Sequence, residues 1–474
     1  MQQKNETSAL ILSLLITLGI LGVGSWWLIG RVNWQHAFNS TGNSAQTGQP
    51  TAGAPQAVAS RLSTGERLLF PTGASPQKQA AIQAIAQGNY ETAISNLEAS
   101  LEANRNDPEA LVYLNNARIG NNPAYAIAIS LPIGTDVNAA LEMLRGVAQA
   151  QNDINQAGGI NGLPLRVVIA NDDNDPAIAQ QVAQALVDNP TVLGVVGHYS
   201  SDVTLAAAQV YQSKGLVSIS PVSTSVKLSG FGDYIFRTVP SDFIAARALA
   251  EYALRNQQTQ AAVFFNSQSG YSQSIKSEFV TALSLGGGQT VSEFDLSAPD
   301  FSPSESVAQA RQQGATVLVL LPNSGQLDRA LQVVQINQRQ LALLGGDSVY
   351  APKTLEIGGE AAVGMVVAVA WDILSNSRSP FVVNSRRLWG GDVNWRTAMA
   401  YDGSQALITA IQQDPTRKGV MQTLRSGKFA APGASGPVRF LPSGDRNAPV
   451  QLVKVAPGTR SRYGFDFVPV RPGT

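Results

Sequence analysis

The sequence predicts an α/β protein with two lobes, and two observations carry this prediction. From residue 125 onward, short apolar runs alternate with amphipathic helical patterns. Uninterrupted apolar strands with helices between them are typical of parallel sheets covered on both faces. Because about 350 residues are too many for one open sheet core, we expect two such lobes. The expected strands cover residues 126–131, 165–169, 192–196, 216–219, 261–265, 316–321, 341–344 and 365–370.

The composition excludes several classes of protein. The chain has 474 residues, no net charge and only 14% charged residues, so nothing in it indicates nucleic-acid binding. It has no cysteine, which excludes disulfides, a thiol nucleophile and lipid attachment through cysteine. Its two histidines, His36 and His198, lie far apart in the sequence. A histidine metal site or a Ser-His-Asp triad would therefore depend on His198, since His36 lies in an expected linker.

Residues 8–30 form an apolar run without a charge. As a helix it would reach about 34 Å, enough to cross a hydrocarbon core of about 30 Å. Trp26 and Trp27 lie near its end, where an aromatic belt is expected. We expect a retained transmembrane anchor. The alternative is a cleaved signal peptide, whose apolar core is usually shorter, about 7–15 residues.

Two further segments precede the α/β region. Residues 31–75 are expected to form a flexible linker, because they are rich in Ser, Thr, Gly, Gln, Ala and Pro. Residues 76–120 have helical spacing, and Gly88-Asn89-Tyr90 followed by Ala93 and Leu97 resembles the middle of a tetratricopeptide repeat. We expect these helices to lie outside the two lobes, either as a protein-contact module or as a spacer.

Two hydroxyl-rich turns follow neighbouring strands in the first half of the α/β region. Ser201 precedes a helical pattern and is expected to be its N-cap, which would leave a helix N-terminus free for an anion. The second turn, Val222-Ser-Thr224, follows the next strand. In a parallel sheet such turns open on the same edge, where ligands bind. The alternative is that these hydroxyls only cap helices and close turns.

Acidic residues also follow strands. Asp172, Asp173 and Asp175 precede Pro176, and turn and helix-start chemistry explains them better than a metal site. Asp347, in Gly345-Gly346-Asp347, lies where a carboxylate can meet a ligand cation, or can serve as a turn residue. Walker A, HExxH and GxSxG sequences are absent. We therefore predict no enzyme activity, no catalytic residue, no cofactor and no metal.

The order of several short motifs resembles one family. Residues 152–162, NDINQAGGING, are similar to the INxxGGINGxxL segment of branched-chain-amino-acid-type substrate-binding proteins of ABC transporters. Five further motifs follow in the family's order and at similar separations, and the resemblance covers about residues 125–469. They are residues 197–201, 219–224, 236–239, 270–271 and 345–347.

This resemblance implies the fold of the type I periplasmic binding proteins, with two Rossmann-like lobes and a three-crossover hinge. The crossovers are expected near Pro240, Ala370 and Val453. They would divide the domain, residues 125–474, into a first lobe of about 125–240 and 371–453 and a second lobe of about 241–370 and 454–474. The ligand would lie in the cleft and be buried by hinge closure.

The resemblance also implies roles for site residues. The hydroxyls of Ser201 and Thr224, with the backbone N–H near Val222, would hold the α-carboxylate of an amino acid. From the other lobe, Asp347 would hold the α-ammonium group and Tyr271 would cover the ligand. Asn323 lies where the family senses the ligand side chain, and its polarity argues against a purely aliphatic ligand.

The implied function is capture of an amino acid or a similar small zwitterion for an ABC importer, with the permease as partner. With its anchor, the protein would be tethered to the plasma membrane and face the periplasm or the cell exterior. The alternative is a membrane-anchored sensor that passes its closure to a partner protein, through the helical segment.

Overall fold

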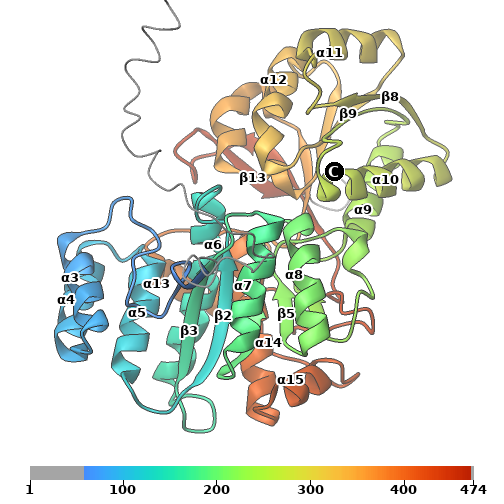
Figure 1. Cartoon of the computed structure of the whole chain (residues 1–474). Coiled ribbons are helices and arrows are strands. Elements are labelled where there is room, and N and C mark those ends of the chain that lie inside the picture. The colour runs from blue at the N-terminus through green and yellow to red at the C-terminus, as the bar shows by residue number, and fades with distance from the viewer. Residues whose placement is uncertain (1–57, 471–474) are drawn as a thin grey trace, which may run out of the picture. The chain divides into compact units, whose positions relative to one another are not determined.

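A computed structural model describes residues 58–470, which form two α/β lobes (Figure 1). The predicted anchor at residues 8–30 lies outside the described residues. Among residues 58–470, no helix combines the length and the apolar character that crossing a membrane requires.

The first lobe contains a six-stranded sheet in the order β1-β3-β2-β4-β5-β6. Its strands are parallel except β1, which runs antiparallel to β3. The strands are mostly buried, as the apolar runs predict. Their bounds are β1 Leu62–Ser63, β2 Tyr125–Leu131, β3 Leu165–Asn171, β4 Val192–Val196, β5 Val217–Ser220 and β6 Ile235–Arg237. The crossover helices are α6 Val137–Gln156, α7 Pro176–Asp188 and α8 Ser201–Lys214.

The second lobe contains a seven-stranded sheet in the order β13-β12-β11-β10-β9-β7-β8. Its strands are β7 Gln260–Phe265, β8 Gln289–Asp295, β9 Val317–Leu321, β10 Ala342–Gly345, β11 Val366–Val369, β12 Gln451–Pro457 and β13 Phe465–Pro469. Its long helices are α9 Asp242–Arg255, α10 Gly270–Leu285, α11 Pro303–Gln312 and α12 Leu327–Asn337. Three strands of this sheet, β8, β12 and β13, were not predicted. In β8 the half-exposed sequence QTVSEFD has no apolar run.

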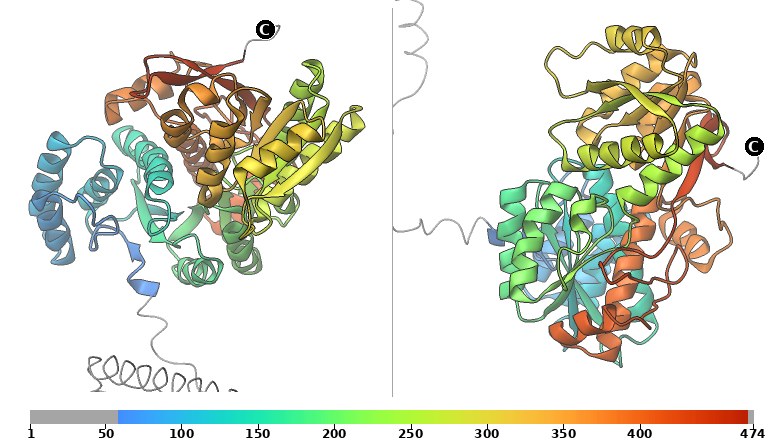
Figure 2. Two further views of the ribbon diagram at one scale, coloured as in Figure 1. Left: turned by 90° about the horizontal axis from the view of Figure 1, so that it is seen from above. Right: turned by 90° about the vertical axis from the view of Figure 1, so that its right-hand side faces the viewer.

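Between β11 and β12 the chain returns to the first lobe. There it forms α13 Pro380–Trp389, α14 Trp395–Gln413 and α15 Arg417–Leu424, and α14 packs along α6 (Figure 2). The helices approach closely at Gly146, where an added Cβ would lie 2.3 Å from the Thr397 carbonyl oxygen. The chain then crosses once more, into β12, so the two lobes are joined by three crossings.

The expectation that residues 76–120 lie outside the two lobes is wrong. Their helices, α3 Pro76–Ala86, α4 Tyr90–Ala103 and α5 Pro108–Ile119, extend the first lobe, and every residue of α5 except Arg118 is buried. The Asn116 amide donates to Val167 O at 2.8 Å and accepts from Val167 N at 3.1 Å and from Gln151 Nε2 at 2.8 Å. Because this side chain joins α5 to β3 and α6, the segment is part of the lobe. The repeat likeness itself remains a prediction.

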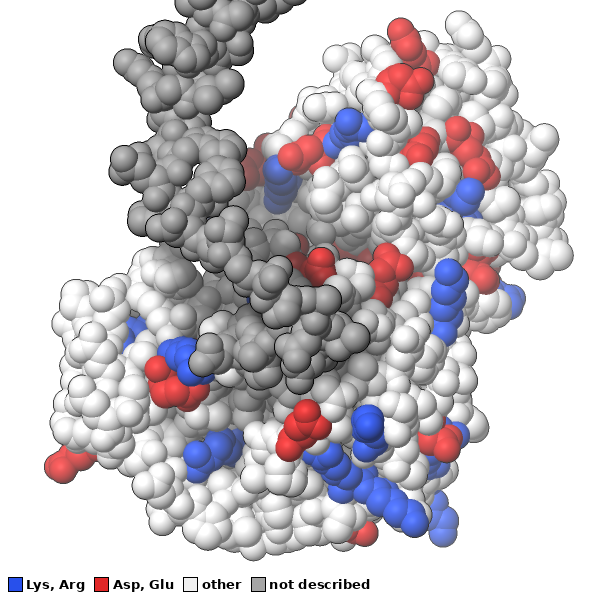
Figure 3. All heavy atoms as spheres, viewed as in Figure 1, with Lys and Arg blue, Asp and Glu red and all other residues white. Residues whose placement is uncertain are grey.

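The predicted linker also contains structured residues. Leu62–Ser63 forms β1 on the edge of β3, and Arg61 Nη1 lies 2.6 Å from Asp173 Oδ2. A strand of two residues carries no periodicity, so the composition alone gave a linker over the whole of residues 31–75. Residues 31–57 lie outside the described part of the chain. Charged side chains of both signs are interspersed over the visible described surface, in keeping with the neutral sequence (Figure 3).

Candidate ligand-binding site

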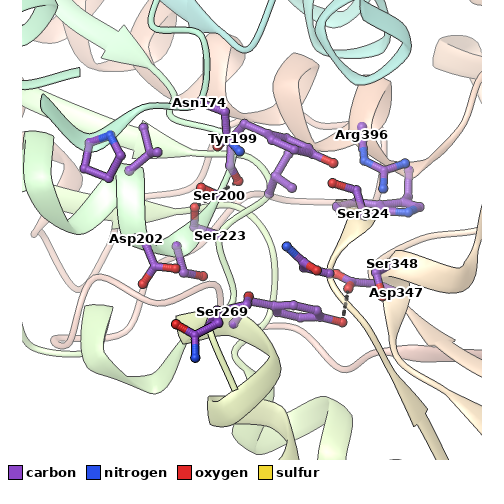
Figure 4. A pocket seen from close by; sticks show the side chains of 18 residues that line it. Asn174, Tyr199, Ser200, Asp202, Ser223, Ser269, Ser324, Asp347, Ser348 and Arg396 are labelled. Carbon is purple, nitrogen blue, oxygen red and sulfur yellow. Dashed lines mark hydrogen bonds between the residues drawn. The ribbon is translucent and has the colours of Figure 1, made fainter. Parts of the chain in front are cut away.

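A cavity of about 380 Å³ lies between the two lobes, at the carboxyl ends of strands from both sheets. It brings together five of the six residues that the sequence predicts for the site (Figure 4). They are Ser201 and Val222 from the first lobe and Tyr271, Asn323 and Asp347 from the second. The sixth, Thr224, does not line the cavity.

The first lobe contributes the start of α8. The prediction that Ser201 is its N-cap is wrong by one position, because Ser200 has the extended N-cap backbone and Ser201 is the first helical residue. Ser201 is nonetheless buried at the cavity, where its hydroxyl accepts from Ser225 N at 3.3 Å. Residues 200–203 all line the cavity, so the positive end of the α8 dipole lies at it.

The turn after β5 supplies Val222 and Ser223. The Ser223 hydroxyl shares a 2.5 Å hydrogen bond with the Thr204 hydroxyl and donates to Tyr199 O at 3.1 Å. Thr224 lies behind this turn, and its buried hydroxyl has no hydrogen-bond partner among the described residues. In this structure Ser223 therefore occupies the lining position that we expected for Thr224.

The second lobe contributes the carboxylate of Asp347 and the tyrosine Tyr271, which donates a hydrogen bond to it. The Tyr271 hydroxyl donates to Asp347 Oδ1 at 2.6 Å. Burial in the cleft raises the pKa of Asp347, although the Tyr271 hydroxyl and the nearby Arg396 lower it in part. An added Cβ at Gly346 would lie 2.5 Å from the Tyr271 hydroxyl oxygen, so this pair requires the glycine. Asp347 stays partly exposed, which leaves its carboxylate open to a cation.

Asn323 follows β9 and lies at the second-lobe wall of the cavity. Its Oδ1 accepts from Asn266 Nδ2 at 2.9 Å, which fixes the orientation of the amide. The Asn323 Nδ2 group has no partner among the described residues, so it is free to donate to a ligand.

Thirteen of the eighteen lining residues were not predicted, among them Tyr199, Asp202, Trp395 and Arg396. Trp395 and Arg396 begin α14, almost 200 residues after the first hydroxyl turn, and only the fold brings them to the cavity. Tyr199 and Asp202 flank the predicted serine, so widening the motif by two positions would have included them.

The lobes contact each other beside the cavity. Asp202 Oδ2, at the start of α8, accepts from the backbone N–H of Gly270, at the start of α10, at 2.9 Å. Nearby, Val226 N donates to Ser274 Oγ at 3.1 Å. A carboxylate of one lobe therefore lies on a helix N-terminus of the other.

Asp242 lies at the first crossing between the lobes, where α9 begins. Its side chain is fully buried, and neither carboxylate oxygen has a well-aligned hydrogen bond. Burial raises the pKa of Asp242 to about 7, against the opposing effect of the nearby Ser274 and Thr224 hydroxyls. The Asp242 carboxyl group at this crossing therefore stays protonated up to near neutral pH.

The buried histidine does not form a catalytic centre. His198 Nδ1 lies 2.6 Å from Asp172 Oδ2, its Nε2 lies 3.0 Å from the Tyr211 hydroxyl, and all three side chains are fully buried. Both ring nitrogens of His198 therefore have partners inside the first lobe, away from the cavity. Asp175 caps α7, as the turn interpretation predicts. Within residues 58–470 no cluster of three or more His, Asp or Glu side chains could hold a metal ion.

The chain is similar to known binding proteins over most of this region. It is 26% identical to the "Amino acid binding protein" of Pseudomonas aeruginosa over 58% of this chain and 75% of that protein. It is 24% identical to the "Leucine-, isoleucine-, valine-, threonine-, and alanine-binding protein" of the same organism over 67% of this chain and 86% of that protein.

A solved structure shows the same fold. The ABC transporter substrate-binding protein from Desulfitobacterium hafniense, in complex with Leu, superposes with a TM-score of 0.62 at 22% identity, over 73% of this chain and all of that one. The family model described as "Periplasmic binding protein" matches residues 127–460. The relatives in this family bind solutes and are not enzymes. The chain belongs to the periplasmic binding protein family and is a solute-binding protein with the type I fold.

Proposed function

We propose that this cleft binds an amino acid or a similarly small zwitterion for an ABC importer. The observation that carries the proposal is the opposite chemistry of the two lobes. The α8 N-terminus, with the Ser201 hydroxyl, suits a carboxylate, and Asp347, held by Tyr271, suits an ammonium group. Thr224 would join the carboxylate site only if closure moved its turn.

Both charged groups of such a ligand lose water when the cleft closes. Each therefore needs charge-assisted hydrogen bonds in the bound state. Because the partners belong to different lobes, the ligand favours the closed conformation by its differential affinity. This coupling gives a permease a way to distinguish the loaded protein from the empty one.

The relatives named above support transport, and we propose an ABC permease as partner and a location outside the plasma membrane. The sensor alternative depended on a separate helical segment that could pass on a signal. Because α3, α4 and α5 are built into the first lobe, that observation no longer favours a sensor.

A thermal-shift panel on the full chain in detergent tests the proposal. A binding amino acid at about 100 times its dissociation constant should stabilise the protein by about 2.7 kcal/mol. The Asp347→Asn variant is the matched control, since it keeps the shape of the site and removes the charge. Stabilisation by carboxylic acids without an amine, and by no amino acid, would contradict the proposal.

A further inference from the structure

The ligand cavity ends at a guanidinium group whose hydrogen-bonding capacity is largely unused. Arg396 is the second residue of α14, and its side chain is about nine-tenths buried. It lines the ligand cavity and also a neighbouring cavity of about 700 Å³. Tyr199, Ser324 and Ser348 line both spaces as well, so Arg396 lies where the ligand cavity continues along the cleft.

The structure fixes the position of Arg396 but leaves part of its hydrogen-bonding capacity unused. Its Nη1 donates to Glu142 Oε2 at 3.1 Å, and its guanidinium carbon lies 4.6 Å from the centre of the Trp395 ring. Its Nε is buried without a partner among the described residues, and its side-chain hydrogen bond runs from Nη1. A guanidinium presents five N–H groups in a fixed fork that matches a carboxylate. The edge that carries Nε and Nη2 is therefore available.

Asp347 and Arg396 lie at the same end of the site, on the right of Figure 4, whereas Ser200 and Ser223 lie on the left. Arg396 is close enough to lower the pKa of Asp347. Burial alone would lower the pKa of Arg396, but Tyr199 and the carboxylates of Glu142 and Asp347 raise it above its ordinary value. The guanidinium is therefore charged whenever a ligand binds.

Charged groups of both signs surround this end of the site. Arg145 and Arg396 oppose the carboxylates of Glu142, Asp347 and Asp136. Asp136 also caps α6 by accepting from Ala139 N at 3.0 Å and receives the Tyr199 hydroxyl at 3.0 Å. A ligand ammonium group would occupy the Asp347 carboxylate, and Arg396 would keep Glu142 as its ion-pair partner.

We infer that Arg396 binds a second carboxylate of the ligand, so that the preferred ligand is an acidic amino acid. The inference rests on the proposed function, because it assumes that the α-ammonium group occupies Asp347. The α-carboxylate then lies at the α8 N-terminus, the ammonium group on Asp347, and the side-chain carboxylate on the free edge of Arg396. An aliphatic side chain of the same length would leave the Nε and Nη2 donors without partners, and an amide would offer them one uncharged acceptor oxygen in place of a carboxylate.

Calorimetry with L-glutamate, L-glutamine and L-norvaline tests this assignment, since the three side chains have similar length and differ in charge and polarity. The full chain should bind glutamate at least 10-fold more tightly than glutamine and norvaline. In Arg396→Gln, glutamate should lose at least 10-fold in affinity, whereas norvaline should change by less than 3-fold.

Two further variants test the assignment if Arg396→Gln fails to fold. Arg396→Lys keeps the charge without the fork, so glutamate should bind with intermediate affinity. Arg145→Gln removes a nearby cation that lines the neighbouring cavity but not the ligand cavity, and it should spare the preference for glutamate.

Two outcomes separate the inference from the proposed function. If the wild-type chain bound glutamine or norvaline as tightly as glutamate, the role of Arg396 would be overturned and the amino-acid site would stand. If it bound no amino acid, the proposed function would fail and the inference with it.

Discussion

The two lobes meet at one cleft but offer a ligand different chemistry. The first-lobe turns present hydroxyls that already bond to one another and to the backbone, as Ser223 does with Thr204 and Tyr199. The second lobe presents a single carboxylate, Asp347, oriented by Tyr271. A network of neutral groups can position a ligand without a large desolvation cost, whereas a partly buried charge selects its counter-ion strongly. We therefore expect the first-lobe turns to orient the ligand, and the charged groups, Asp347 of the second lobe and Arg396 of α14, to discriminate between ligands.

The lobes also differ in construction. The second lobe is completed by two strands, β12 and β13, whereas the first lobe is completed by helical segments from before and after the second-lobe strands β7 to β11. Residues 58–120 cover one side of it, and α14 returns to pack along α6. A buried ion cluster fixes the added helices, since Lys78 Nζ lies 2.8 Å from both Asp107 Oδ2 and Glu109 Oε2. The first lobe should therefore be more sensitive to truncation.

Removing residues 1–120 is expected to have the largest effect. It exposes the apolar side of α6 and β3 and breaks the bonds of Asn116, so the first lobe should not fold cooperatively. Circular dichroism melting and calorimetry check this. Removal of residues 1–57 is the control and should leave the melting temperature unchanged, because the contacts that hold α3, α4 and α5 in the first lobe lie within residues 58–470. A cooperative melt of the shorter chain would contradict the integrated role of the helices.

The crossing between the lobes predicts a pH dependence. An aspartate in an unfolded chain has a pKa of about 3.9, and burial raises the folded pKa of Asp242 to about 7. The unfolded state therefore loses its proton at lower pH than the folded state. Between about pH 4 and pH 7 the free energy of unfolding should fall as pH rises, by on the order of a few kcal/mol, and then level off.

Asp242→Asn should remove this slope, because the amide does not titrate. Urea unfolding of both proteins between pH 4.5 and pH 8 is the measurement. The variant should gain stability relative to the wild type as pH rises, and two parallel curves would rule out the raised pKa.

The sequence predicted eight of the thirteen strands that the structure describes, and it did so for a physical reason. Buried parallel strands leave uninterrupted apolar runs, and a glycine pair before Asp347 marks a turn that tolerates no side chain next to Tyr271. It could not predict Arg396, because a polar residue at a helix start has no local signature of a binding role. Residues 58–120 were misassigned because their contacts with β3 and α6 are long-range and leave no trace in composition or periodicity.

Asp347→Ala tests whether the second-lobe carboxylate selects the ligand. It should weaken binding of the preferred amino acid by at least 10-fold, since the ligand ammonium group would be buried without a counter-ion. A carboxylate ligand of the same length without the amine should lose little. Calorimetry with both ligands decides the matter, and unchanged affinity for the amino acid would return Asp347 to a turn-forming role.

Ser201→Ala and Thr224→Val test whether the first-lobe hydroxyl groups orient the ligand. Ser201 lines the cavity and Thr224 does not, so the first substitution should weaken amino-acid binding by about 10-fold, the size of one hydrogen bond to a charged group. Thr224→Val should cost less than 3-fold. Equal losses would show that the bound conformation turns the Thr224 hydroxyl toward the ligand, as the family resemblance implies.

The smallest expected effect concerns the hydrogen bond that joins the two lobes beside the cavity. Asp202 accepts from the Gly270 N–H across the cleft, and an added Cβ at Gly270 would lie 2.2 Å from Asp202 Oδ1. Gly270→Ala should therefore push the exposed carboxylate aside without removing a charge from either lobe. Because Asp202 is exposed, its contact contributes about 0.5–1 kcal/mol, so ligand affinity should fall about 2- to 5-fold through a less favoured closed state.

Asp202→Ala should give a similar loss, and the double variant should lose no more than either single one, since both break the same contact. Calorimetry of the three variants measures this cycle. Additive losses would mean that Asp202 acts on the ligand directly and that the lobes close without this contact.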